Sequence, residues 1–187
     1  MTILRLVVLL SVVCLLPADA FAQDEAERMS EVLCLDDPEC LAMSRHRLTA
    51  ESLRTMFAVD RELFALMKEH PDLWTRMSDL AQSINPQGKL RAIAVSAQVH
   101  EGIPELAQVL RRHKTTGHEY LMTHAVAMIT AMAADTFAYE AQREGRSELP
   151  AAMMTPAMRF WRSMDPALKA EADAWKKMRG YDKGLNR

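Results

Sequence analysis

The sequence is poor in glycine and in aromatic residues. It has 6 glycines in 187 residues, aromatic side chains make up only 6% of it, and strand-like alternation of polar and apolar residues is nearly absent. Good helix formers are abundant instead, namely alanine, leucine, methionine, glutamate and arginine. These absences predict an all-α protein, and the length favours one domain.

The chain also lacks the motifs of common catalytic and cofactor sites. It has no G-x-S-x-G or S-x-x-K for a nucleophilic serine, no phosphate-binding loop, no G-x-G-x-x-G and no C-x-x-C-H for covalent haem attachment. His118-Glu119 begins like the zinc motif H-E-x-x-H, but its fifth position is Met122, and the next histidine, His124, falls on a different side of a helix. We therefore predict that the protein is not an enzyme and has no resident cofactor.

A strong charge of one sign is missing too. The formal net charge is −2, and no run of basic residues marks a surface for anionic lipids. General nucleic-acid binders carry a basic patch or stripe. Nucleic acid is therefore excluded as a general partner.

The N-terminus has the pattern of a cleaved export signal. Arg5 gives a positive start, Leu6–Leu16 is an apolar run, and Ala20-Phe21-Ala22 is a small-x-small cleavage site that would leave Gln23 as the new N-terminus. We predict a signal peptide over 1–22 and a periplasmic or secreted mature chain.

The same N-terminal pattern has three alternatives. Ala18-Asp19-Ala20 is a second cleavage site, and a retained membrane anchor is disfavoured because the apolar run is too short to span a bilayer. A lipoprotein at Cys14 is rejected because the preceding residue, Val13, is not small.

Two cysteines, Cys34 and Cys40, remain in the mature chain. An even number of cysteines in an exported protein favours a disulfide, and Asp37-Pro38 between them is a turn signal. Two buried free thiols are the alternative. The spacing is not C-x-x-C, so a redox-active pair is not expected.

Apolar periodicity, caps and prolines divide the mature chain into helices. We predict a short helical N-terminal segment over 23–47, a helical domain over 48–179 and a frayed tail over 180–187. The expected helices cover 24–33, 38–47, 49–70, 73–84, 89–100, 104–114, 116–143, a short stretch from 155, and 166–178.

The stretch 116–143 is the longest and most apolar of these helices. Between Tyr120 and Ala134 the only polar side chains are Thr123, His124 and Thr130. A helix that is apolar nearly all round is usually wrapped by other helices. We therefore predict an irregular multi-helix bundle around this central helix, with Ile129 and Met132 in the core, and no membrane span in the mature chain.

The sequence predicts the surroundings of two residues on the other helices, Asp60 and Trp74. Asp60 interrupts the apolar face of helix 49–70, either as an acid at the edge of the stripe paired with an arginine or as a buried functional carboxylate. Trp74 lies on the apolar face of helix 73–84, at helical spacing from Met77 and Ala81, and is expected in the core.

Methionine is abundant, with 14 residues. Methionines usually fill gaps in helical cores. The alternative is a copper or haem site, since thioethers and imidazoles bind Cu(I) and four-helix bundles can hold haem. His124, Met128 and Met132 are the candidate ligands for that alternative.

The order of short motifs resembles a group of exported bacterial all-helical proteins with no assigned activity. The likeness covers Leu48 to Met178 and implies a common fold but no mechanism. The residues that carry it are Ile103, Pro104, Glu105, Leu106, Glu119, Tyr120, Leu121, Ala131, Met132 and Ala133.

Taken together, these patterns predict an exported, non-enzymatic helical domain that binds a partner protein or a small apolar ligand. The alternative function is a periplasmic copper or haem carrier that uses histidine and methionine ligands.

Overall fold

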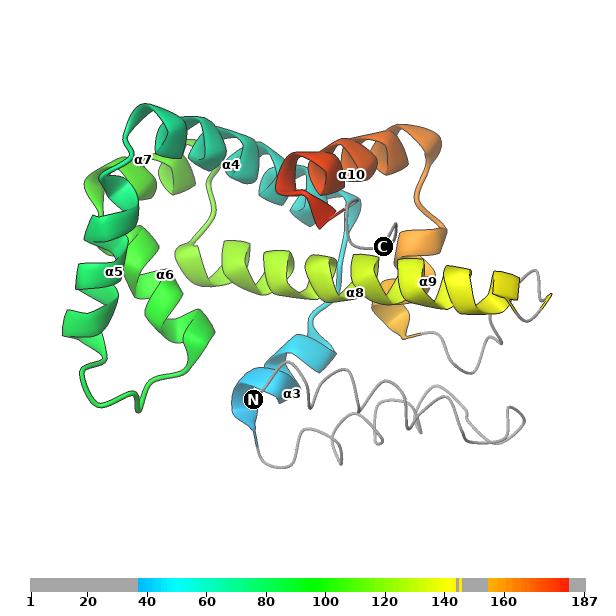
Figure 1. Ribbon diagram of the computed structural model, residues 1–187, viewed down its shortest axis with the longest axis horizontal. Helices are drawn as coiled ribbons and strands as arrows, with labels where there is room; N and C mark the ends of the chain where they lie inside the picture. The colour runs from blue at the N-terminus through cyan, green and yellow to red at the C-terminus, as the bar shows by residue number, and fades with distance from the viewer. Residues whose placement is uncertain (1–36, 144, 146–154, 182–187) are drawn as a thin grey trace.

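The computed structural model describes residues 37–143, 145 and 155–181, and within those ranges the chain forms eight α-helices and no strand. The prediction of an all-α fold is therefore confirmed. The expected signal peptide (1–22), the expected first helix (24–33) and Cys34 lie outside the described residues. Figure 1 shows the helices, which are α3 (Pro38–Arg45), α4 (Ala50–Glu69), α5 (Leu73–Ile84), α6 (Ala92–Gly102), α7 (Pro104–Arg112), α8 (Gly117–Arg143), α9 (Pro156–Arg162) and α10 (Pro166–Arg179).

Several helix ends follow directly from local sequence. The Thr49 hydroxyl accepts a hydrogen bond from the backbone N–H of Ser52 at 3.0 Å, which caps α4. The Asp165 carboxylate accepts from the backbone N–H of Leu168 at 2.9 Å and caps α10. Gly180 ends α10 in the left-handed conformation, with φ of 74°, where a side chain would be strained.

Two helix starts receive a carboxylate from another helix. One of them, α8, is also capped locally by the Thr116 hydroxyl, which accepts from the backbone N–H of Glu119 at 3.1 Å. Glu39 of α3 accepts a hydrogen bond from the backbone N–H of Ile93 at 2.7 Å, and Glu101 of α6 accepts from that of Gly117 at 2.8 Å. These contacts satisfy donors that a helix start otherwise leaves unpaired. The contact from α3 places the start of α6 at Ala92, so the predicted start at Lys89 is wrong.

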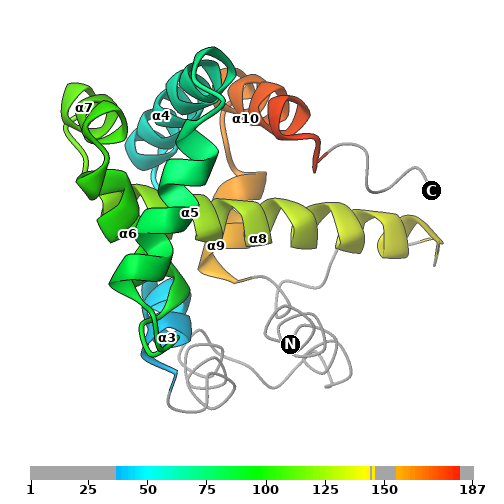
Figure 2. The same cartoon turned by 60° about the vertical axis from the view of Figure 1, so that its left-hand side comes forward.

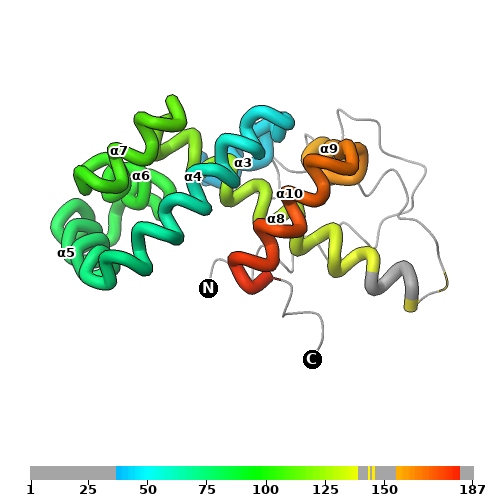
Figure 3. The backbone as a smooth tube through the Cα atoms, turned by 90° about the horizontal axis from the view of Figure 1, so that it is seen from above, coloured from blue at the N-terminus to red at the C-terminus, as the bar shows by residue number. Residues whose placement is uncertain are grey.

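Helix α8 runs through the middle of the described helices (Figure 1). It contacts α3, α4, α6, α7 and α9, and side chains of α10 reach it as well, since Lys176 binds Asp135 at 3.0 Å. Helices α4 and α10 pack against each other along one side of α8, and α3 lies on the opposite side. Figures 2 and 3 show α5, α6 and α7 gathered at the N-terminal end of α8.

The buried side of α8 mixes large side chains, such as that of Phe137, with small ones. Ala127 and Ala131 are buried, whereas Met132 is 52% exposed and Ile129 is half-buried. The prediction that Met132 belongs to the core is therefore wrong. A helix that is apolar around its whole circumference gives no sequence signal for the side that faces outward.

By length and composition alone, Gly117–Ala138 would also suffice to cross a membrane. The interior helix of a soluble protein passes the same test, and several of the described helices contact α8. The absence of a membrane span stays a prediction.

Candidate functional site

Asp60 is a carboxylate in the interior of the protein. Its side chain is 0% exposed, and its neighbours on α4, Met56, Phe57 and Leu63, are buried as well. The expected arginine partner is confirmed, because Arg179 binds Asp60, but the expected position at the edge of the stripe is wrong. A buried carboxylate is costly unless donors satisfy it.

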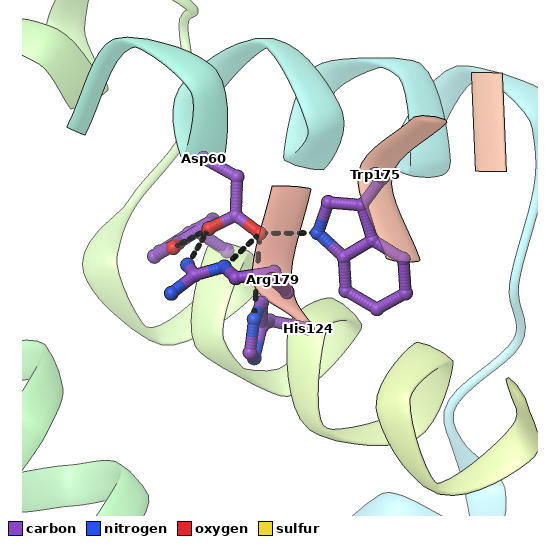
Figure 4. A network of polar contacts seen from close by, with 5 residues as sticks. Asp60, His124, Trp175 and Arg179 are labelled. Carbon is purple, nitrogen blue, oxygen red and sulfur yellow. Dashed lines mark hydrogen bonds and ion pairs between the residues drawn. The ribbon is translucent and has the colours of Figure 1, made fainter. Parts of the chain in front are cut away.

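Donors from two other helices surround Asp60 (Figure 4). Oδ1 accepts hydrogen bonds from the Tyr120 hydroxyl and from Nη2 of Arg179. Oδ2 accepts from Nε1 of Trp175 and, at 3.1 Å, from Nε of Arg179. We call Asp60, Tyr120, His124, Trp175 and Arg179 the carboxylate cluster.

Helical spacing explains how the cluster assembles. Tyr120 and His124 lie four residues apart on α8, and Trp175 and Arg179 lie four residues apart on α10. Residues at this spacing share one face of a helix. Each helix therefore presents two side chains to Asp60, and α10 reaches it from more than a hundred residues along the chain.

His124 completes the cluster without a hydrogen bond. Its Nε2 lies 3.4 Å from Oδ2 of Asp60, which is close enough for attraction, but it meets no hydrogen-bond geometry with any described residue. The imidazole also packs with its edge against Trp175, with ring centroids 5.8 Å apart.

Electrostatics keep Asp60 ionised. Burial by itself would raise the pKa of the carboxyl, but the neighbouring His124 and Arg179 outweigh it and hold the pKa well below its usual range. Burial and the negative Asp60 raise the pKa of Tyr120, so its phenol stays protonated. Burial by itself would lower the pKa of Arg179, but the hydrogen bonds to Asp60 and the negative charge of Asp60 outweigh it and raise that pKa.

Both oxygens of Asp60 are thus occupied, and the residue is sealed from solvent. A general base needs a reacting proton within hydrogen-bond reach. The arrangement instead supports a role in holding α4, α8 and α10 together.

An open hollow of about 240 Å³ lies between α5 and α6. The two helices pack side by side at one end of α8. The apolar part of the lining comes from Trp74, Met77, Ala81 and Val99. Trp74 is 70% exposed, so the prediction that it belongs to the core is wrong. It sits in the first turn of α5, where Leu73 alone turns inward.

The polar part of the lining consists of Ser78, Ser96 and His100. His100 is only 7% exposed, and its Nδ1 lies 2.7 Å from the carbonyl oxygen of Ser96. Its ring also packs against Tyr120 of the carboxylate cluster, with centroids 5.8 Å apart. His100 therefore lies between the hollow and the cluster.

The candidate copper or haem ligands do not form one set of free donors. His124 directs Nε2 toward Asp60, Met128 is partly buried against the core, and Met132 points outward. In the described part of the chain, no three His, Cys, Asp or Glu side chains lie close enough together to hold a metal ion. This absence concerns His, Cys, Asp and Glu and not methionine, so the copper or haem alternative stays a prediction.

The disulfide between Cys34 and Cys40 also stays a prediction. Cys40 lies in the first turn of α3, and Cys34 is outside the described residues.

Sequence reasoning found Asp60 but missed the rest of the cluster and the place of His100 in the lining of the hollow. The available signal was the pair of i, i+4 spacings, Tyr120 with His124 and Trp175 with Arg179. No protein-family model, curated protein or solved structure matches this chain. The resemblance to exported helical proteins also stays a prediction.

Proposed function

We propose that this chain is an exported, non-enzymatic helical domain that binds an apolar group, from a partner protein or a small ligand, in the hollow between α5 and α6. The observation that carries the proposal is the position of Trp74, whose indole is 70% exposed at the rim of an apolar hollow. An occupant would bury the indole and the hollow together, and that apolar burial would stabilise the complex.

The chemistry of the lining supports an uncharged occupant. None of the residues that line the hollow is an aspartate, glutamate, lysine or arginine. A charged group placed there would lose its hydration without gaining a partner. Single exposed apolar side chains are ordinary, but a tryptophan beside a hollow is the arrangement found at binding hot spots.

We also infer that α8 organises the bundle, and its contacts with α3, α4, α6, α7, α9 and α10 support this. Export rests on the pattern in residues 1–22. Sequencing of the N-terminus of periplasmic or secreted protein should begin at Gln23, and a chain that retains residues 1–20 would contradict export by this route.

The binding proposal is tested by titrating the protein with toluene and following amide and indole resonances by NMR. We expect saturable shifts at Trp74, Ala81 and Val99. Trp74→Ala should weaken binding strongly, because it removes one wall of the hollow. Met132→Ala is the matched control, since it truncates an exposed apolar side chain on α8 and should leave binding unchanged. Absence of saturable shifts around the hollow would contradict the proposal.

A further inference from the structure

The imidazole of His100 gives the hollow one defined hydrogen-bond acceptor. Its Nδ1 lies 2.7 Å from the Ser96 carbonyl oxygen, which can only accept, so Nδ1 carries the hydrogen and donates. In the neutral ring the other nitrogen, Nε2, then has a free lone pair. Nε2 makes no hydrogen bond with a described residue, and since it is not among the fully buried atoms that lack a partner, solvent reaches it.

The ring is held in this neutral form. Burial is the largest influence on His100, and it lowers the pKa of the imidazole below its usual value. The ring is also fixed in place, since Tyr120 packs against it from α8. A rigid neutral acceptor at the wall of an apolar hollow favours a ligand that brings a donor and no charge.

The rest of the lining favours an aromatic ring. Trp74 offers an indole for ring packing, and Met77 offers a thioether, which makes favourable contacts with aromatic rings. The hollow measures about 240 Å³. An enclosed apolar cavity of about 150 Å³ binds benzene, so one substituted ring fits this space.

The geometry points to a phenol as the occupant: its ring lies against Trp74 and Met77, and its hydroxyl donates to Nε2 of His100. This inference rests on the proposed function, because it names the ligand chemistry of the same hollow. A phenol can come from a small phenolic compound or from a tyrosine side chain of a partner.

Three probes of nearly equal size separate the hydroxyl from the ring. p-Cresol carries a donor, 4-methylanisole keeps the oxygen but has no donor, and toluene has neither. NMR titrations of the full mature chain should show p-cresol binding roughly three- to tenfold more tightly than either of the others, the range expected for one net hydrogen bond. The ¹⁵N resonance of His100 Nε2 should move with p-cresol alone.

Two variants assign this preference to His100. His100→Phe removes the acceptor, and it should bind p-cresol and toluene equally. Ser78→Ala is the matched control, because it removes another polar group of the lining and should keep the preference. If His100→Phe does not fold, the three-probe comparison and the His100 resonance in the unmodified protein still decide the matter.

The outcomes distinguish the inference from the function on which it rests. Equal binding of p-cresol, 4-methylanisole and toluene at Trp74 would overturn the phenol inference and leave apolar binding intact. Binding of none of them at the hollow would overturn both. An N-acetylated Gly-Tyr-Gly amide serves as a further arm. If this peptide binds more tightly than p-cresol, the phenol comes from a tyrosine of a partner protein. If it binds more weakly, the phenol comes from a small phenolic compound.

Discussion

Arg179, the last residue of α10, holds Asp60 in the middle of α4, with its Nε 3.1 Å from Oδ2 of the carboxylate. The two residues lie 119 positions apart in the chain. The pair therefore fastens the C-terminal helix to the first long helix. Trp175, one turn earlier on α10, donates to the same carboxylate and makes the attachment specific in orientation.

Asp60→Asn should destabilise the protein strongly. The amide cannot neutralise Arg179, and its NH₂ group faces donors that need an acceptor, so a loss of about 3–5 kcal/mol in the free energy of unfolding is expected. Glu62→Gln is the matched control on the same helix, because Glu62 pairs with Arg112 and His113 at a partly exposed site. It should cost no more than about 1 kcal/mol in urea unfolding. Equal costs would show that the buried cluster contributes nothing special.

The contribution of Asp60 should disappear in acid. Its pKa is lowered in the folded protein, so its stabilisation is fully present above the pKa of the unfolded chain, about 3.9, and is lost as the pH falls further. The difference in the free energy of unfolding between the unmodified protein and Asp60→Asn, measured in urea, should therefore begin to shrink below roughly pH 4 and should go on shrinking as the pH falls toward the much lower pKa of Asp60 in the folded protein. A constant difference down to strongly acidic pH would contradict the ion pair.

Gly117→Ala should destabilise the protein, although the position is helical. Alanine in place of glycine normally favours a helix by about 1 kcal/mol. Here a Cβ would lie 2.8 Å from the carbonyl oxygen of Ala97, so α8 and α6 would have to move apart, at a cost of about 1–3 kcal/mol. Thermal or urea unfolding gives the sign directly, and a stabilised variant would show that the close approach of the two helices is not needed.

Truncations on two helices should separate core from surface. Leu106→Ala on α7 removes a fully buried side chain and should cost about 2–5 kcal/mol. Met132→Ala should cost well under half of that, because its side chain is half in solvent. Denaturant unfolding of the two variants checks the contrast, and a large loss at Met132 would mean that something covers this face of α8 in solution.

The sequence predicted helices best where local chemistry decides. Thr49, Thr155 and Asp165 cap helices as expected, and the left-handed Gly180 ends α10. The start of α6 could not be predicted from a local cap, because the group that accepts the hydrogen bond from the backbone N–H of Ile93 is the carboxylate of Glu39 on a different helix.

Burial was harder to predict than helicity. Trp74 and Met132 both lie on apolar helices, yet both are exposed. For Met132 the cause is an apolar pattern with no preferred side, so that packing with neighbours alone selects the buried face. For the carboxylate cluster, one acid on an apolar face was visible, but its donors on α8 and α10 meet only through the tertiary fold.

A crystal structure of the protein with bound bromobenzene would test the proposed binding site most directly, because the anomalous signal of bromine marks the position of the ring. The account predicts a bromine peak in the hollow, against Trp74 of α5 and Val99 of α6. It also predicts that Trp74→Ala crystals, soaked in the same way, lose that peak. A peak found only elsewhere on the molecule, or no peak in a hollow that is open to solvent in the crystal, would contradict the claim that this hollow binds apolar groups.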